Sequence, residues 1–156
     1  MQRGYGETVD RVSSVIDWLK ARADCTGKVG VIGFCVGGGL AYLLGCTGSV
    51  LVTAPNYGKT PPDQMWPRSC PVVASYGARD RIFAREAGKA EESLDQNRII
   101  HDVKLYPEAG HSFMNQTEGH RILAALTRPF MTVGYNRDAA EDAWLRIGTF
   151  FGSYLR

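Results

Sequence analysis

A glycine-rich turn between two apolar segments most strongly constrains how this chain folds. Residues 33–39 read Gly-Phe-Cys-Val-Gly-Gly-Gly, and they follow the β-branched run at residues 29–32 and precede a leucine-rich segment. This order predicts a strand, an abrupt turn and a helix, with Cys35 at the turn. We expect Cβ atoms at Gly33 and Gly37 to clash with the strand and the helix, which explains the glycines.

A cysteine in this position has a chemical interpretation. It stands at the carboxyl end of a strand and at the first turn of a helix, where backbone N–H groups and the helix dipole favour the thiolate. The thiolate is the nucleophilic form of cysteine. The alternative is a glycine-rich turn with a buried cysteine, and the rest of the sequence has to decide between the two.

The composition is that of one globular domain, which we expect to span residues 1–156. The net charge of +2 is too small to indicate a nucleic-acid partner, and no apolar run is long enough to span a bilayer. Residues 1–7 lack the apolar core of a signal peptide. No cysteine lies in metal-ligand spacing, so we expect reduced thiols, a cytoplasmic protein, no metal and no cofactor. The four cysteines are Cys25, Cys35, Cys46 and Cys70.

Apolar periodicity predicts an alternation of helices and strands. The expected helices cover residues 8–23, 37–44, 84–96, 118–127 and 139–154, and the expected strands lie near 29–33, 49–53, 71–76 and 102–106. A turn-rich loop is expected at 54–62. The fold class is therefore α/β, a four-stranded parallel sheet with helices on both faces and a ligand crevice at the carboxyl ends of the strands. The expected apolar face of the last helix consists of Trp144, Leu145, Ile147, Phe150 and Phe151.

Three of the predicted strand ends carry reactive side chains. Cys35 follows the first strand, Asp80 the third and His111 the fourth, which is the order of nucleophile, acid and histidine found in α/β-hydrolases. In such a triad the histidine takes the thiol proton, and the carboxylate fixes the histidine tautomer. Taken singly, Asp80 also fits a surface ion pair and His111 a turn. His101 and His120 are weaker candidates, since one precedes a strand and the other lies in a predicted helix.

Three motifs together resemble the dienelactone hydrolase family, a branch of the α/β-hydrolases. They are Gly-Phe-Cys-Val-Gly-Gly-Gly, Tyr-Gly-Ala-Arg-Asp-Arg and Tyr-Pro-Glu-Ala-Gly-His-Ser-Phe-Met-Asn, and the resemblance runs from about residue 7 to 155. It implies a triad acting on esters and lactones, with Cys35 as nucleophile, Asp80 as acid and His111 as base. It also implies that the backbone N–H of Val36 is an oxyanion donor. The candidate substrate contacts are Phe34, Tyr57, Ser112 and Phe113.

The resemblance also indicates what differs here. Four strands and a helix that precede the 8–23 helix in the family have no counterpart, and a second oxyanion amide goes with them. Asn115 stands where dienelactone hydrolase proper has an arginine for the substrate carboxylate. We expect a thiol-dependent hydrolase of esters or lactones. The alternatives are a weakly active or non-catalytic truncated protein serving as an assembly domain, and a redox-sensing thiol at Cys35.

An open strand edge predicts self-association. Without the preceding strands, residues 29–33 are expected to lack a neighbour on one side, and unpaired strand edges attract other strands. We expect a two-fold homodimer that buries this strand, residues 8–23 and the last helix. The alternative is a monomer whose connection at 127–137 folds over the gap. The expected partners are thus a second copy and a small ester or lactone, with no nucleic acid or membrane.

Overall fold

The protein, seen in a computed structural model, is described over residues 3–116 and 132–156. In chain order the elements are α1 (Arg3–Lys20), β1 (Gly30–Phe34), α2 (Val36–Gly45), β2 (Val52–Asn56), the 3₁₀ helix η1 (Asp63–Arg68), β3 (Val72–Gly77), α3 (Ala84–Gln96), β4 (His101–Tyr106) and α5 (Arg137–Leu155). The predicted helix at 118–127 lies outside the described residues. No helix in the described ranges is long and apolar enough to cross a membrane.

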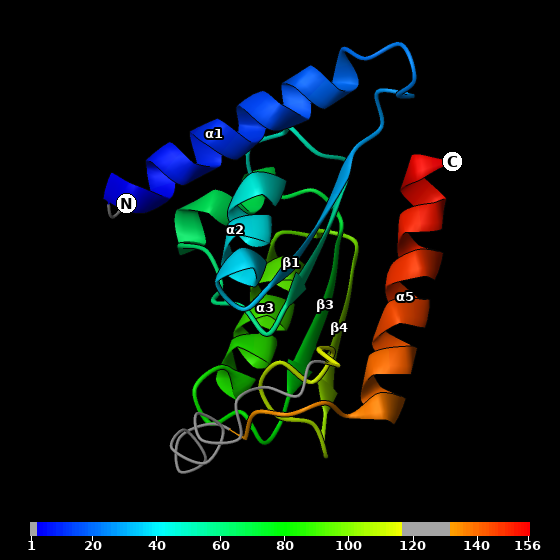
Figure 1. Ribbon diagram of the computed structural model, residues 1–156. Helices are drawn as coiled ribbons and strands as arrows, with labels where there is room; N and C mark the ends of the chain where they lie inside the picture. Colours follow the sequence, from blue (N-terminus) through cyan, green and yellow to red (C-terminus); the bar gives the residue numbers. More distant parts are fainter. Residues whose placement is uncertain (1–2, 117–131) are drawn as a thin grey trace.

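The four strands form one parallel sheet in the order β1-β2-β3-β4. Figure 1 shows α1, α2 and α3 on one side of this sheet and α5 on the other. The predicted four-stranded parallel sheet with helices on both faces is confirmed. All four carboxyl ends lie at the same edge, so the loops that follow β1, β3 and β4 meet there.

Alternating side chains of the central strands build a separate core on each face of the sheet. On the α3 face, Val72, Ala74 and Tyr76 of β3 pack with Leu94 of the helix. On the other face, Val73 packs with a cluster that includes α5. Because successive residues of a strand point to opposite faces, one strand serves both layers. The site at the carboxyl edge is therefore supported from two sides.

The second strand lies further along the chain than predicted. The predicted strand covered 49–53, with a loop from 54, whereas β2 runs from Val52 to Asn56 and contains Pro55. Proline has no N–H, so it normally argues against a central strand. Here the ladder to β3 has bonds on either side of it, from the Thr53 N–H to Pro71 at 3.0 Å and from the Tyr57 N–H to Ser75 at 2.8 Å. The strand tolerates one missing bond and continues to the edge of the site.

The apolar face of α5 differs from the predicted one. Its buried face consists of Ala139, Ala140, Ala143 and Ile147. Trp144 and Leu145 are exposed, so their assignment to the buried face was wrong, whereas Phe150 and Phe151 are partly buried against the core. Alanines bring a helix close to a sheet, and the bulkier residues then lie around its sides. Residue size alone does not indicate this arrangement.

Replacement of one buried isoleucine on α5 tests this packing. Ile147 is 2% exposed, and Ile147→Ala is expected to lower the free energy of unfolding by about 2–5 kcal/mol. Ile100, which is 63% exposed, provides the matched control. Ile100→Ala should change the free energy of unfolding by less than about 0.5 kcal/mol. Equilibrium urea unfolding measures both. Equal destabilisation by the two variants would contradict the assigned faces.

Candidate active site

Cys35 lies at the tip of the turn between β1 and α2 in a backbone conformation that L residues rarely adopt. Its φ is 55° and its ψ is −117°. Such a conformation costs about 1–3 kcal/mol and persists only where the surroundings hold it. The Cys35 N–H donates to the Asn56 carbonyl at 3.1 Å. The Cys35 carbonyl accepts from the N–H groups of Gly38 and Gly39, at 3.0 and 3.2 Å.

The glycines around Cys35 differ in what they allow. A Cβ on Gly33 would overlap the carbonyl group of Gly37, so the predicted clash at position 33 is confirmed. A Cβ on Gly37 would meet nothing within 4 Å, so the predicted clash there is wrong. The close approach lies one residue later, because a Cβ on Gly38 would stand 2.6 Å from the carbonyl oxygen of Asn56. The need for glycine at position 38 thus comes from the end of β2, which lies outside the local sequence motif.

The N-terminus of α2 supplies main-chain donors beside Cys35. Val36 is the first residue of the helix, so its N–H has no acceptor within the helix. The helix dipole adds partial positive charge at the same end. Val36 exposes its side chain to solvent, so a small molecule can approach this end of the helix. A negative charge that develops on the oxygen of a carbonyl group attacked by the Cys35 sulfur would be stabilised there.

His111 and Asp80 form a buried pair across the loops that follow β4 and β3. The Nδ1 atom of His111 lies 2.6 Å from Oδ2 of Asp80, and the two residues are 4% and 0% exposed. The second carboxylate oxygen of Asp80 accepts the N–H groups of Ile82 and Phe83, both at 3.1 Å. Because a carboxylate only accepts, His111 carries its proton on Nδ1. The lone pair of Nε2 is then available to a thiol proton.

Two aromatic rings pack against the imidazole of His111, and main-chain hydrogen bonds to Thr132 fix its loop. Its ring centroid lies 5.1 Å from that of Tyr57 and 5.3 Å from that of Phe83. The His111 N–H donates to the carbonyl of Thr132 at 2.7 Å, and the Thr132 N–H reaches the carbonyl of Arg79 at 3.5 Å. Thr132 thus connects the histidine loop to the loop that contains Asp80.

Tyr57 links the nucleophile turn to the histidine. It follows β2 directly, and its ring packs beside those of Phe34 and His111. The distances between ring centroids are 6.0 Å and 5.1 Å. Its hydroxyl donates to Oδ1 of Asn115 at 3.4 Å. Burial, with the electrostatic influence of the neighbouring Cys35 as a second cause, raises the pKa of Tyr57, so the hydroxyl stays protonated. Cys35 packs against the same cluster of buried side chains.

The other predicted substrate contacts lie around this centre. Phe34 is partly buried between Tyr57 and Trp144, with its ring centroid 5.9 Å from that of Trp144. Ser112 adopts a left-handed φ of 59°, which turns the chain after His111. Phe113 is fully buried and packs on Tyr57, so it supports the site from behind.

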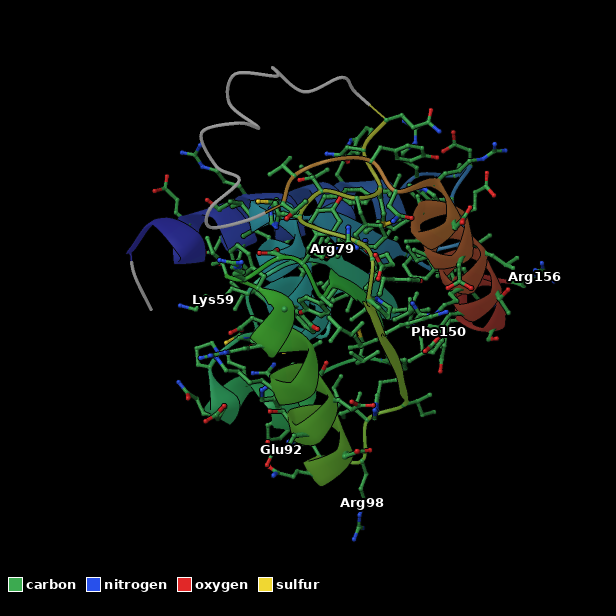
Figure 2. The ribbon with its side chains drawn as sticks, turned by 90° about the horizontal axis from the view of Figure 1, so that it is seen from below. Lys59, Arg79, Glu92, Arg98, Phe150 and Arg156 are labelled. Carbon is green, nitrogen blue, oxygen red and sulfur yellow. The ribbon has the colours of Figure 1, made fainter. Side chains whose placement is uncertain are left out.

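Of the other two histidines, His101 lies among the described residues, at the opposite end of a strand. His101 begins β4 at the amino end of the strand, and its Nδ1 lies 2.8 Å from the carbonyl of Ile99. His120 lies outside the described residues. Figure 2 views the molecule from the carboxyl edge of the sheet, where Arg79 lies near the middle and Phe150 lies on α5 to one side. Over the described ranges, no cluster of His, Cys, Asp or Glu is arranged to hold a metal ion.

Three residues that support the site were not singled out from the sequence. Asn56 was assigned to a loop, although a polar residue that follows an apolar run can indicate the end of a strand beside a site. Phe83 lies beside His111 only because α3 begins there, and Thr132 reaches His111 across the fold. Neither contact is encoded in a local motif, so sequence reasoning had no signal for them.

Relatives with curated names align with this chain over most of its length. The carboxymethylenebutenolidase of Rhodococcus opacus is 31% identical over 138 residues, which cover 81% of this chain and 50% of that protein. The carboxymethylenebutenolidase of Pseudomonas putida is 27% identical over 133 residues, covering 80% of this chain and 52% of that protein. The chain spans about half the length of these relatives.

Solved structures share the fold. The structure described as m3DLH superposes with a TM-score of 0.77 at 19% identity, covering 98% of this chain and 64% of that one. The carboxylesterase Cest-2923 from Lactobacillus plantarum WCFS1 gives a TM-score of 0.67 at 16% identity, covering 94% and 68%. These likenesses establish an α/β-hydrolase fold. The sequence itself matches the dienelactone hydrolase family over residues 1–155, and the chain belongs to that family.

Proposed function

We propose that this chain is a thiol-dependent hydrolase of esters or lactones that uses Cys35, His111 and Asp80 as its triad. The buried bond between His111 and Asp80 is the observation that carries this proposal. A histidine fixed in this way has one nitrogen left for proton transfer. The strained turn that presents Cys35 lies at the same edge of the sheet, and Tyr57 contacts the histidine ring there.

The proposed reaction proceeds through a thioester. Nε2 of His111 takes the proton of the Cys35 thiol, and the thiolate sulfur bonds to the carbonyl carbon of the substrate. The N–H of Val36 donates to the resulting oxyanion. When the tetrahedral intermediate collapses, the C–O bond to the alcohol breaks and His111 returns the proton to the alkoxide. Water, deprotonated by His111, then attacks the thioester, and the acid and the free thiol are released.

The walls of the site favour a small, uncharged substrate. Phe34, which is partly buried, offers aromatic surface in front of the fully buried Tyr57, and Asn115, whose Oδ1 accepts from the Tyr57 hydroxyl, offers a neutral polar side chain. Relatives named carboxymethylenebutenolidase and a solved carboxylesterase support lactones and esters as the substrate class. A second candidate function is an assembly domain without turnover. The outer strand β1 favours it, because Ile32 of this strand is 38% exposed and an unpaired strand edge attracts other strands.

Hydrolysis of short p-nitrophenyl esters tests the triad. Cys35→Ala and His111→Ala are expected to reduce turnover to the uncatalysed rate, because the nucleophile or its base is lost. Asp80→Asn should lower kcat by about 10⁴, since the histidine then takes the wrong tautomer. Cys25→Ala, which removes a partly buried thiol away from the site, serves as the matched control and should retain full activity. Turnover that survives in Cys35→Ala would refute the mechanism.

Alkylation by iodoacetamide tests the activation of the thiol without any substrate. Burial raises the pKa of Cys46 to about 11 and that of Cys70 to about 12, so both stay protonated at neutral pH and react slowly. Cys35 should be labelled fastest, because it lies at a helix N-terminus at the same edge of the sheet as His111. His111→Ala should slow it. Peptide mapping by mass spectrometry measures each site, and equal labelling of Cys46 and Cys35 would contradict an activated nucleophile.

We further propose a homodimer that joins two copies through β1. The sheet has two outer strands, and the charged residues Asp102 and Lys104 protect β4, whereas β1 carries no charge. Ile32 of β1 is 38% exposed, and Val15 and Trp18 of α1 are exposed as well. A two-fold axis would pair the two β1 strands antiparallel and extend the sheet through both copies.

Light scattering at micromolar concentration tests the dimer. The wild type should show twice the mass of one chain, and Ile32→Lys should return it to the mass of one chain because a charge is placed on the open edge. Leu105→Lys, on the opposite edge strand, is the matched control and should remain dimeric. A single-chain mass for the wild type would exclude the dimer.

A further inference from the structure

We infer that Asn56 is a positioning residue that holds the nucleophile in place, which rests on the proposed role of Cys35. Asn56 is the last residue of β2 and pairs with Phe34 in the register of the sheet. It is fully buried although it is polar. Its surroundings show what this polar side chain does.

Asn56 bonds to both peptide groups that flank Phe34. Its side-chain Nδ2 donates to the Gly33 carbonyl at 3.2 Å. Its main-chain carbonyl accepts the N–H of Cys35 at 3.1 Å. A further bond from Nδ2 to the Ala54 carbonyl, at 3.1 Å, ties the amide to its own strand. These contacts fix the path by which the chain reaches Cys35.

Close backbone packing also couples Asn56 to the first turn of α2, on the other side of Cys35. A Cβ on Gly38 would lie 2.6 Å from the Asn56 carbonyl oxygen, and a Cβ on Gly58 would overlap the main chain of Gly38. The first turn of α2 therefore rests against residues 56–58 without spare volume. A displacement of Asn56 has to displace the turn that presents Cys35.

Cys35 needs a restraint of this kind. Its φ of 55° is unfavourable for a residue with a side chain and relaxes unless neighbouring groups oppose the change. Proton transfer between the thiol and His111 depends on their separation at the ångström level. His111 is fixed independently by Asp80, so a relaxed turn would misplace the sulfur alone.

The unpaired oxygen of Asn56 indicates that the amide is kept for its donors. Oδ1 is buried and has no hydrogen-bond partner among the described residues. An unpaired buried carbonyl destabilises a fold, and an apolar side chain of similar shape would avoid that penalty. A stability role alone therefore accounts poorly for asparagine at this position.

Thr53 of the same strand provides a matched control. It is also fully buried, and its hydroxyl lies 3.3 Å from the Val31 carbonyl and 3.0 Å from the Ala41 carbonyl. Its bonds join β2 to β1 and α2 away from the turn. Thr53→Val thus removes the same kind of cross-strand bond without touching the approach to Cys35.

Two replacements, Asn56→Leu and Asn56→Ala, test the inference in the full chain. Both should lower kcat for a p-nitrophenyl ester by about tenfold or more while KM stays within about twofold, because geometry is lost and binding is not. Both should also slow the alkylation of Cys35 by iodoacetamide, because the displaced sulfur lies further from the helix N-terminus and from His111. Thr53→Val should lower the unfolding temperature and leave kcat and the alkylation of Cys35 unchanged.

Hydrogen exchange at residues 33–39 makes the test independent of turnover. The Asn56 variants should speed exchange there, and Thr53→Val should not. Faster exchange together with an inactive wild type would support the positioning role and refute the hydrolase. Unchanged exchange and an unchanged alkylation rate in both Asn56 variants would overturn the inference, as would equal effects in Thr53→Val.

Discussion

The unfavourable backbone conformation of Cys35 is the constraint on which the rest of the site depends. A residue with a side chain stays at a φ of 55° only where its neighbours leave no alternative. Because Gly33 has no side chain, the main chain of Gly37 can lie against it on one side of Cys35. Because Gly38 has none, the end of β2 can lie against it on the other side. The sheet edge, the helix start and the Asn56 bonds therefore form one packed unit, which fixes the backbone of Cys35.

Asp80 and His111 obey a different constraint, because they are buried polar groups. Burying a carboxylate without partners is strongly unfavourable, and Asp80 avoids this by accepting from His111 and from the N–H groups of Ile82 and Phe83. The start of α3 thereby becomes part of the site. The main-chain bonds of Thr132 join the loop of His111 to the loop of Asp80. The pair is therefore held by main-chain bonds as well as by side chains.

What the sequence predicted correctly depends mainly on local chemistry. The strand, turn and helix around Cys35 follow from glycines and β-branched residues within a few positions, and the parallel sheet follows from the alternation of elements. The errors concern packing between elements. Pro55 lies inside β2, Gly37 faces open space, and Leu145 faces solvent, because distant parts of the chain decide these contacts. The roles of Asp80 and His111 stay predictions, although the two residues are in contact.

The described residues hold all the groups needed for proton transfer, and the reason is topological. The candidate triad comes from the ends of β1, β3 and β4, which belong to one continuous sheet. Oxyanion binding would draw on a different part of the fold, because the main-chain donors that the described residues offer beside Cys35 lie at the N-terminus of α2. Loss of one oxyanion donor typically lowers a rate by about 10²–10³. The close packing of Gly38 against Asn56, which fixes this helix start, therefore matters for the proposed reaction as much as the contact between His111 and Asp80.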